Sequence, residues 1–385
     1  ATLERLSMLY PSNTDIKLYL LSILLKMDSK VKVDLMVRTM MNDPNTSIET
    51  RKLIAELLSQ SGKEEKKQQK WFAYLDIKYS QTEESNISGI TKTKQLLQED
   101  SKIPYTAVDS KFVVEYDKSY SRAGSLTVGR NIDDSSSMFF NLGLDVNTLN
   151  KKAKGESDIL SSSLSYFKVL GDHYISPYVY WSKPNYRRQE DYETTGFGIN
   201  NTYIINEKNN INYGLGFSDT SYVRNANFDT ADDNDNGVYS SFIRHNYNFT
   251  KKIQLGTKLI LNRTESIKEF DSYDSHGISF LYSQILPFGT LKLRSTYLEN
   301  NYDEIESFIS SSLIRKDESL VTSISLDGQL NQILPFFKRY DKNNSIFYTL
   351  NMRRSDVSSN ILNHDIERNY KTIGLTKRIN LNGLF

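Results

Sequence analysis

The chain has 385 residues, a formal net charge of +1 and no cysteine, and it contains 25 Tyr and 18 Phe. A chain of this length accommodates two domains. The absence of cysteine excludes disulfides, thiolate metal sites and a cysteine nucleophile, and the near-neutral charge provides no global field for attracting nucleic acid.

The first part of the chain, residues 1–70, has the spacing of amphipathic helices. Apolar residues recur at intervals of three and four, as in Ile16, Leu20, Ile23 and Leu24. The segments Tyr10-Pro11-Ser12-Asn13 and Asp43-Pro44-Asn45-Thr46 both resemble helix starts and lie about 33 residues apart, close to the tetratricopeptide period. We predict a short all-α, tetratricopeptide-like module of about one and a half helical hairpins. An unrelated small helical bundle is the alternative.

The first residues of the sequence already follow the helical pattern. Ala1 lies directly in a helical pattern, with neither a charged start nor an apolar segment before it. We therefore expect either that a signal peptide has been removed or that the sequence begins inside a longer chain.

From Trp71 onward the apolar pattern changes to a period of two. In one segment, Tyr213, Leu215 and Phe217 alternate with small or polar residues, and such segments recur along the chain with turn clusters between them. Many reach ten or more residues, and a tilted strand of about 9–11 residues crosses a bilayer. We predict a transmembrane antiparallel β-barrel over residues 71–385, with a soluble antiparallel barrel as the alternative.

The expected strand number follows from fifteen candidate segments. They cover residues 71–82, 109–119, 122–131, 136–149, 157–170, 173–185, 192–206, 210–224, 237–249, 252–267, 273–286, 288–301, 317–328, 344–357 and 368–379. Bacterial barrels use even strand numbers, so we predict that residues 109–131 form one strand plus a loop, which gives fourteen strands. Sixteen would result if Ser307 to Arg315 formed a strand of its own.

The connections predict the orientation of this barrel in a membrane. Tight turns such as Leu170-Gly171-Asp172 alternate with long connections such as Asn225 to Asn236, as in outer-membrane barrels with short periplasmic turns. Aromatic residues near strand ends are expected to form girdles at the membrane interfaces; they include Tyr174, Tyr178, Tyr180 and Trp181.

The last segment carries an aromatic terminal pattern. Ile379, Leu381 and Phe385 lie on one face, and the pattern resembles the signal that directs barrels to their assembly machinery. Lipid of the outer membrane and this machinery are therefore the expected partners, with no nucleic acid.

A search for catalytic chemistry leaves no enzyme signature. The sequence contains no HExxH, GxSxG or GxxxxGK[ST] motif, and we predict neither an enzymatic activity nor a cofactor. Asp232, Asn234 and Asn236 match the start of a calcium-binding loop, but Ile243 stands where that loop needs its Glu. We prefer the interpretation of a solvated hairpin loop and keep weak calcium binding as the alternative.

Several basic residues occupy the polar face of the predicted strands and are candidates for lining the lumen. They are Lys258, Lys292, Arg294, Arg353 and Arg378. Such side chains either pair with acidic neighbours or select what passes. The sequence assigns no sign to the lumen charge, because Asp and Glu nearly balance Lys and Arg.

Short segments toward the C-terminus resemble a known barrel family. They are Leu313-Ile314-Arg315-Lys316-Asp317-Glu318-Ser319, Leu320 to Leu326, Phe347 to Arg353, Ser359-Asn360-Ile361, Asn369-Tyr370 and Gly374-Leu375-Thr376-Lys377-Arg378, together with Glu84-Ser85-Asn86-Ile87 near the first strand. These segments resemble the barrel of the surface lipoprotein assembly modifier (Slam) family, which also joins tetratricopeptide repeats to a barrel of about fourteen strands. The order of parts fits most of the chain.

The resemblance implies a non-enzymatic translocator in the bacterial outer membrane, with the helical module in the periplasm. It would deliver surface lipoproteins or other protein clients across that membrane. The repeat-face residues Tyr19, Lys26 and Arg38 are then the client-binding candidates. An exopolysaccharide export porin with periplasmic repeats and a plain diffusion porin are the alternatives.

Overall fold

The structure is a computed structural model in which the chain divides into two compact units, residues 1–70 and residues 71–385. The described residues are 14–26, 33, 36–37, 40, 50, 52–54, 56–57, 71–87, 89–92, 95–97, 105–107, 116–133, 135–150, 156–186, 190–307, 309–310, 312–341, 343 and 345–382. None of the helices in these ranges combines the length and hydropathy that a membrane crossing requires.

The first unit is helical where it is described. Helix α2 (Thr14–Lys26) begins shortly after Pro11, and its Leu21 packs with Met40 and Ile54 in a buried cluster. These three apolar side chains join segments far apart in the sequence, as the helical spacing predicts. The described residues define only short helical pieces and no clear tetratricopeptide hairpin. Both predicted helix starts, residues 10–13 and 43–46, lie outside them.

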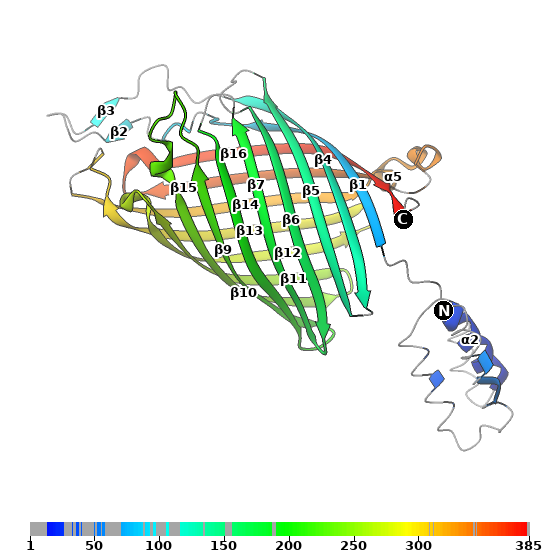
Figure 1. Ribbon diagram of the computed structural model, residues 1–385. Coiled ribbons are helices and arrows are strands. Elements are labelled where there is room, and N and C mark those ends of the chain that lie inside the picture. Colours follow the sequence, from blue (N-terminus) through cyan, green and yellow to red (C-terminus); the bar gives the residue numbers. More distant parts are fainter. Residues whose placement is uncertain are drawn as a thin grey trace. The chain divides into compact units, whose positions relative to one another are not determined.

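The second unit contains a closed antiparallel barrel of fourteen strands (Figure 1). They are β1 (Trp71–Glu84), β4 (Asp117–Asp133), β5 (Ser136–Leu149), β6 (Ser157–Leu170), β7 (His173–Tyr186), β8 (Tyr192–Ile204), β9 (Asn209–Tyr222), β10 (Asn236–Thr250), β11 (Ile253–Ser266), β12 (Tyr273–Leu286), β13 (Gly289–Ile305), β14 (Ile314–Gln329), β15 (Ile346–Ser359) and β16 (Ile366–Asn380). Neighbours in the chain pair with one another, and β1 closes the barrel by pairing with β4 on one side and β16 on the other.

The predicted number of fourteen strands is confirmed. The described part of residues 109–131 forms the single strand β4, as expected, while residues 109–115 lie outside the described residues. The sixteen-stranded alternative is wrong, because residues 306–313 connect β13 to β14 and only Ile314 and Arg315 belong to a strand. A small separate sheet, β2 (Gln95–Leu97) with β3 (Tyr105–Ala107), lies in the connection between β1 and β4 and was not predicted.

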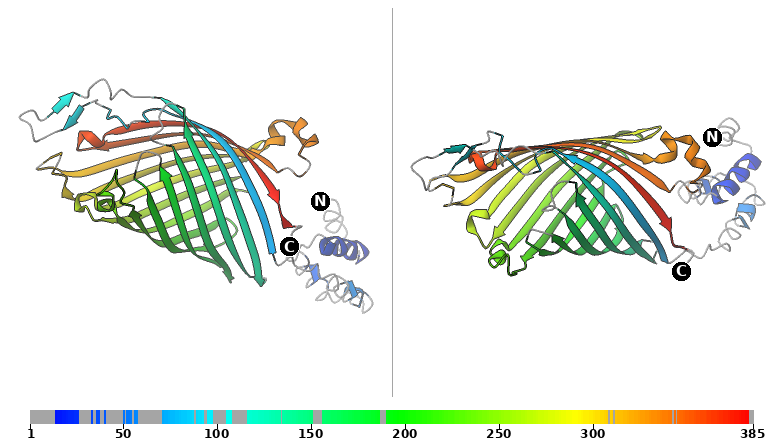
Figure 2. Two further views of the ribbon diagram at one scale, coloured as in Figure 1. Left: turned by 45° about the horizontal axis from the view of Figure 1, so that its top comes forward. Right: turned by 90° about the horizontal axis from the view of Figure 1, so that it is seen from above.

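The outer face of the barrel wall is apolar on every strand. Each barrel strand carries an exposed large apolar side chain on the same face, for example Ile77, Ile132, Leu142, Leu164, Val179, Phe197, Leu215, Ile243, Leu259, Phe280, Leu293, Ile324, Leu350 and Ile373. The alternate residues of each strand point into the barrel and are mostly polar or small. Both views of Figure 2 show the strands winding around a single wall.

The connections at the two ends of the barrel differ in length. One end, where β1 begins and β16 ends, carries tight turns at residues 171–172, 205–208, 251–252 and 287–288. We call it the turn end and the opposite end the loop end. Short 3-10 helices lie in the loop-end connections: η3 (Ala231–Asn234), η4 (Glu269–Asp271) and η6 (Leu362–His364).

The turn end has one exception to its short connections. The connection between β14 and β15 contains helix α5 (Leu330–Ile333) and the 3-10 helix η5 (Pro335–Arg339). The base of this connection is tied to the barrel through Asp341. Its carboxylate accepts hydrogen bonds from Ser345 Oγ at 2.7 Å and from the backbone N–H of Ile346 at 2.8 Å, and it lies 3.1 Å from Lys377 Nζ on β16.

Replacing Asp341 by Asn is expected to loosen this connection and to remove a pH-dependent part of its stability. Burial opposes ionisation of the carboxyl, but the hydrogen bonds from Ser345, Lys377 and the backbone lower its pKa to about 2. The stabilisation is therefore complete above the unfolded pKa of about 3.9 and is lost as the pH falls toward 2. Urea unfolding in detergent at pH 7 should show a loss of about 1–3 kcal/mol. A difference between variant and wild type that does not shrink from pH 4 to pH 2 would contradict this assignment.

Candidate functional site

The inward face of β10 to β15 brings basic side chains together. Arg244 on β10 is paired in register with Lys258 on β11. Arg294 on β13 and Arg353 on β15 are both paired with Ser323 on the intervening strand β14. We call Arg244, Lys258, Arg294 and Arg353 the cationic wall.

The cationic wall lacks carboxylate partners. Within the described part of the chain, none of its four side chains forms a salt bridge. Lys258 Nζ instead lies 4.3 Å from the centre of the Phe242 ring, and Arg353 lies 5.6 Å from that of Tyr370. Aromatic faces stabilise a cation without neutralising it, so this region of the lumen carries positive charge.

The other two predicted lumen residues are neutralised by acidic partners. Lys292 Nζ lies 3.4 Å from Asp327 Oδ2 on β14. Arg378 forms two hydrogen bonds with Asp76 on β1, at 2.8 and 2.7 Å, and its guanidinium also lies over the Tyr74 ring. Of the five predicted residues, Lys258, Arg294 and Arg353 therefore share the cationic wall, whereas Lys292 and Arg378 belong to ion pairs.

Arg244 was missed in the sequence analysis, although its signal was present. It lies in a segment whose apolar residues alternate, and it falls on the polar face with Asn246. Its position beside Lys258 depends on the register between β10 and β11, which is not visible in either strand alone.

The Arg378–Asp76 pair joins the first strand of the barrel to the last, so its loss should weaken closure. We expect Arg378→Gln to leave the Asp76 carboxylate without its two charge-assisted hydrogen bonds and to cost about 1.5–3 kcal/mol. The midpoint and slope of urea unfolding in detergent provide the measurement. Lys292→Gln is the matched control, because its longer and more exposed pair with Asp327 contributes about 0–1 kcal/mol. Equal losses for the two variants would disprove a special role at the seam.

The inward face of β7 and β8 carries aromatic and small residues. Tyr178 and Tyr180 on β7 are paired with Gly198 and Gly196 on β8, and an added Cβ at either glycine would fall within 3 Å of a tyrosine ring. The two rings stack with their centres 6.3 Å apart. The prediction that Tyr178 and Tyr180 form an interfacial girdle is therefore wrong, since both face the lumen.

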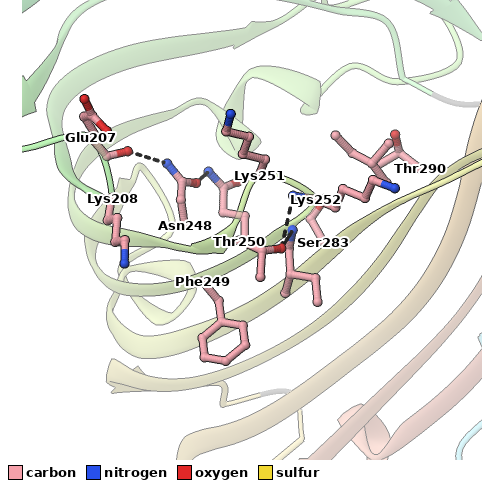
Figure 3. A pocket seen from close by; sticks show the side chains of 12 residues that line it. Glu207, Lys208, Asn248, Phe249, Thr250, Lys251, Lys252, Ser283 and Thr290 are labelled. Carbon is pink, nitrogen blue, oxygen red and sulfur yellow. Dashed lines mark hydrogen bonds between the residues drawn. The ribbon is translucent and has the colours of Figure 1, made fainter. Parts of the chain in front are cut away.

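A second cluster of lysines lies at the turn end of β9 to β13. A cavity of about 690 Å³ is lined there by Lys208, Lys251 and Lys252, with Glu207 beside them (Figure 3). The turn is held by Thr250 Oγ1, which accepts hydrogen bonds at 3.1 Å from the backbone N–H groups of Lys252 and of the following residue. The inward residues Asn248, Gln254 and Ser283 also line this cavity, so it opens onto the polar face of the wall.

At the loop end, segments that carry the family resemblance meet. Asn86 is buried and has a φ of 60°. Its Nδ2 donates hydrogen bonds to the carbonyl oxygens of Ile90 at 2.7 Å and Glu367 at 3.0 Å, and its Oδ1 accepts one from the backbone N–H of Ile90 at 2.7 Å. Asn suits this left-handed backbone conformation. The neighbouring Ser85 Oγ accepts a hydrogen bond from the backbone of Asn369 at 2.9 Å. The segment at residues 85–86 thus fastens the end of β1 to β16.

The candidate calcium loop is held by protein groups. Asp232 forms a salt bridge with Arg224. Asn234 Oδ1 accepts a hydrogen bond from Lys268 Nζ at 2.6 Å, and Asn236 Nδ2 donates to the backbone oxygen of Asn234 at 3.0 Å. The Lys268 ammonium therefore already binds the amide oxygen of Asn234 that a calcium ion would need as a ligand. Over the described ranges, no group of three or more His, Asp or Glu side chains is placed to hold a metal.

The remaining predicted residues are only partly visible. Tyr19 lies on α2 with 62% of its surface exposed. Lys26 is the last residue of α2, but its side chain lies outside the described residues, as does all of Arg38. Ile379 is on the outer face of β16, and Leu381 donates a backbone hydrogen bond to Ala73 at 2.9 Å, whereas Phe385 lies outside the described residues.

Comparisons with known proteins give a likeness at the level of the barrel alone. No family model and no curated protein matches the chain. Among solved structures, a loop L8 deletion mutant of OmpT, an outer membrane protein of Vibrio cholerae, aligns over 80% of this chain and 99% of its own, with 7% identity and a TM-score of 0.43. Acinetobacter baumannii OccAB3 and Pseudomonas aeruginosa OpdQ each align over 81% of this chain and 99% of their own, with 8% identity and TM-scores of 0.38.

Proposed function

We propose that the protein is a non-enzymatic transport barrel of a bacterial outer membrane. One observation carries the location: all fourteen strands of the closed barrel expose large apolar side chains on the outer face. A soluble protein rarely exposes a continuous apolar band of this kind, whereas a bilayer requires one. The inner face is polar and charged, which suits a path for hydrophilic material.

We further propose that the transported material is a protein client, in first place a surface lipoprotein. The support is the family resemblance, together with the loop-end seam at which Ser85, Asn86 and Asn369 meet. In this proposal residues 1–70 lie in the periplasm and receive the client, with Tyr19, Lys26 and Arg38 as candidate contacts. The barrel itself would be inserted by the outer-membrane assembly machinery.

A plain diffusion porin is the second candidate, and the cationic wall favours it. Basic side chains without acidic partners attract small anions and select what passes. Such a pore would need no client and no function of the helical unit.

Deleting the gene and labelling surface proteins for proteomics separates the two candidates. The translocator proposal predicts that particular lipoproteins disappear from the cell surface while their total amount in the cell persists, and that the full chain restores them. An unchanged set of surface proteins, combined with ion conductance of the purified barrel in planar bilayers, would replace the translocator with the porin.

A further inference from the structure

We propose that the cationic wall is a binding site for multivalent oxyanions, such as phosphate or sulfate groups carried by the transported material. The inference deepens the proposed transport function, because it names a substrate class for the lumen. The site itself is defined by residues on the inward face of β10 to β15, and this definition does not depend on where the barrel is located.

The register of the strands places the four cations close to one another. Residues directly opposite in an antiparallel pair have Cβ atoms about 4.5–5.5 Å apart, so Arg244 and Lys258 are immediate neighbours. Arg294 and Arg353 flank one serine, Ser323, from its two sides. Lys258 is paired with Ser279, Ser279 is paired with Thr296, and Arg294 lies two residues from Thr296 on the same face of β13. These side chains therefore converge on one region of the wall.

The positive charge of the cationic wall is not compensated by acidic partners among the described residues. Two other basic lumen residues are neutralised by acids, Lys292 by Asp327 and Arg378 by Asp76. The cationic wall has no such partner among the described residues, although an acidic side chain at any neighbouring inward position could have supplied one. Mutual repulsion inside a barrel is costly because the surrounding wall screens charges less than bulk water does. An anion bound between the cations relieves that repulsion.

Hydroxyl groups of serine and threonine lie beside the cations on the same face. Ser279, paired with Lys258, and Thr296 on β13 place two hydroxyl groups between Lys258 and Arg294, joined by a 2.8 Å hydrogen bond. Ser323 adds a hydroxyl between Arg294 and Arg353. Guanidinium groups bind oxyanions in a bidentate manner, and hydroxyl groups can complete the oxygen contacts. Arg294 and Arg353 are also exposed on this face, so a ligand in the lumen reaches them.

The turn end of the same strands also carries positive charge, which would attract an approaching anion. Lys208, Lys251 and Lys252 surround the cavity at the turn end of the same strands. A group of like charges at an opening raises the local concentration of the oppositely charged ligand. An anion entering there would meet positive charge at the mouth and again at the cationic wall.

The test measures binding and conduction on the full chain in detergent or lipid. Inorganic pyrophosphate serves as the probe, and titration calorimetry compares wild type with the triple variant Arg244→Gln, Lys258→Gln, Arg294→Gln. We expect the triple variant to lose at least about tenfold in affinity and the wild-type affinity to fall as salt rises. Lys292→Gln is the control with one basic lumen residue removed from an ion pair, and it should bind as the wild type does.

Conductance in planar bilayers under a potassium chloride gradient provides the second measurement. The reversal potential should indicate anion preference for the wild type and shift toward cation preference in the triple variant, and pyrophosphate should block only the wild type. Equal pyrophosphate affinity in wild type and triple variant, with both shown to be folded by heat-dependent gel mobility, would overturn the site. Pyrophosphate binding without any conductance or client transport would leave the site standing and disprove the proposed transport function.

Discussion

Replacing Leu259 by Arg is expected to destabilise the membrane-inserted barrel by about 2–4 kcal/mol, the cost of a basic side chain facing lipid near the bilayer midplane. Leu259 lies in the middle of β11 with 52% of its surface exposed on the outer face. No neighbouring water would solvate a guanidinium there. Urea unfolding from lipid vesicles measures the loss.

The matched control lies on the same strand. Asn262 is three residues from Leu259, so its side chain lies on the opposite face of the strand and points into the barrel. An Arg remains solvated there, and Asn262→Arg should therefore change stability by less than about 1 kcal/mol. Equal costs for the two substitutions, or no cost for either, would contradict the assignment of the two faces.

Gly277→Ala is expected to produce the second large effect, from overpacking of the wall. A Cβ at Gly277 would lie 2.1 Å from the backbone oxygen of Tyr297 and 3.0 Å from the Cα of Leu298. Since backbone atoms of a paired strand cannot rotate away, the register between β12 and β13 must distort. We expect a loss of about 1–3 kcal/mol or more, measured as a lowered urea midpoint and as incomplete refolding into detergent.

Gly124→Ala on β4 controls for the chemical change alone. No atom lies within 4 Å of the position that its Cβ would take, so the substitution should be neutral or slightly stabilising. A similar loss at both glycines would show that the close approach of Tyr297 is not the cause.

The strands of the barrel were largely predictable because one physical pattern determines them. Alternation of apolar and polar side chains sustained over a bilayer-spanning length gave boundaries for β5 and β6 that the structure reproduces, and the same pattern set the strand number. The helices in the connection at residues 330–345 were not anticipated, because the period-two pattern predicts strands and the sequence does not say where the apolar residues of a connection pack.

The composition of the site depended on information that single strands lack. The basic residues were assigned to the polar face from parity alone, but whether each one is neutralised depends on register. Lys292 meets Asp327, and Arg294 does not meet an acid, because neighbouring strands align in one particular way. The error at Tyr178 and Tyr180 has a related origin: their aromatic character suggested the membrane interface, whereas the glycines on β8 leave room for them inside.

The central claim is that an apolar outer face and a wet inner face alternate around one closed wall in lipid. The chain has no cysteine, so single cysteines at residues 254 to 261 of β11 can be spin-labelled without background and examined in vesicles. The account predicts that odd positions, including Leu255 and Leu259, are accessible to oxygen dissolved in lipid, and that even positions, including Lys258, are accessible to a water-soluble nickel reagent. Water accessibility at both parities, or a protein that stays soluble without detergent, would contradict it.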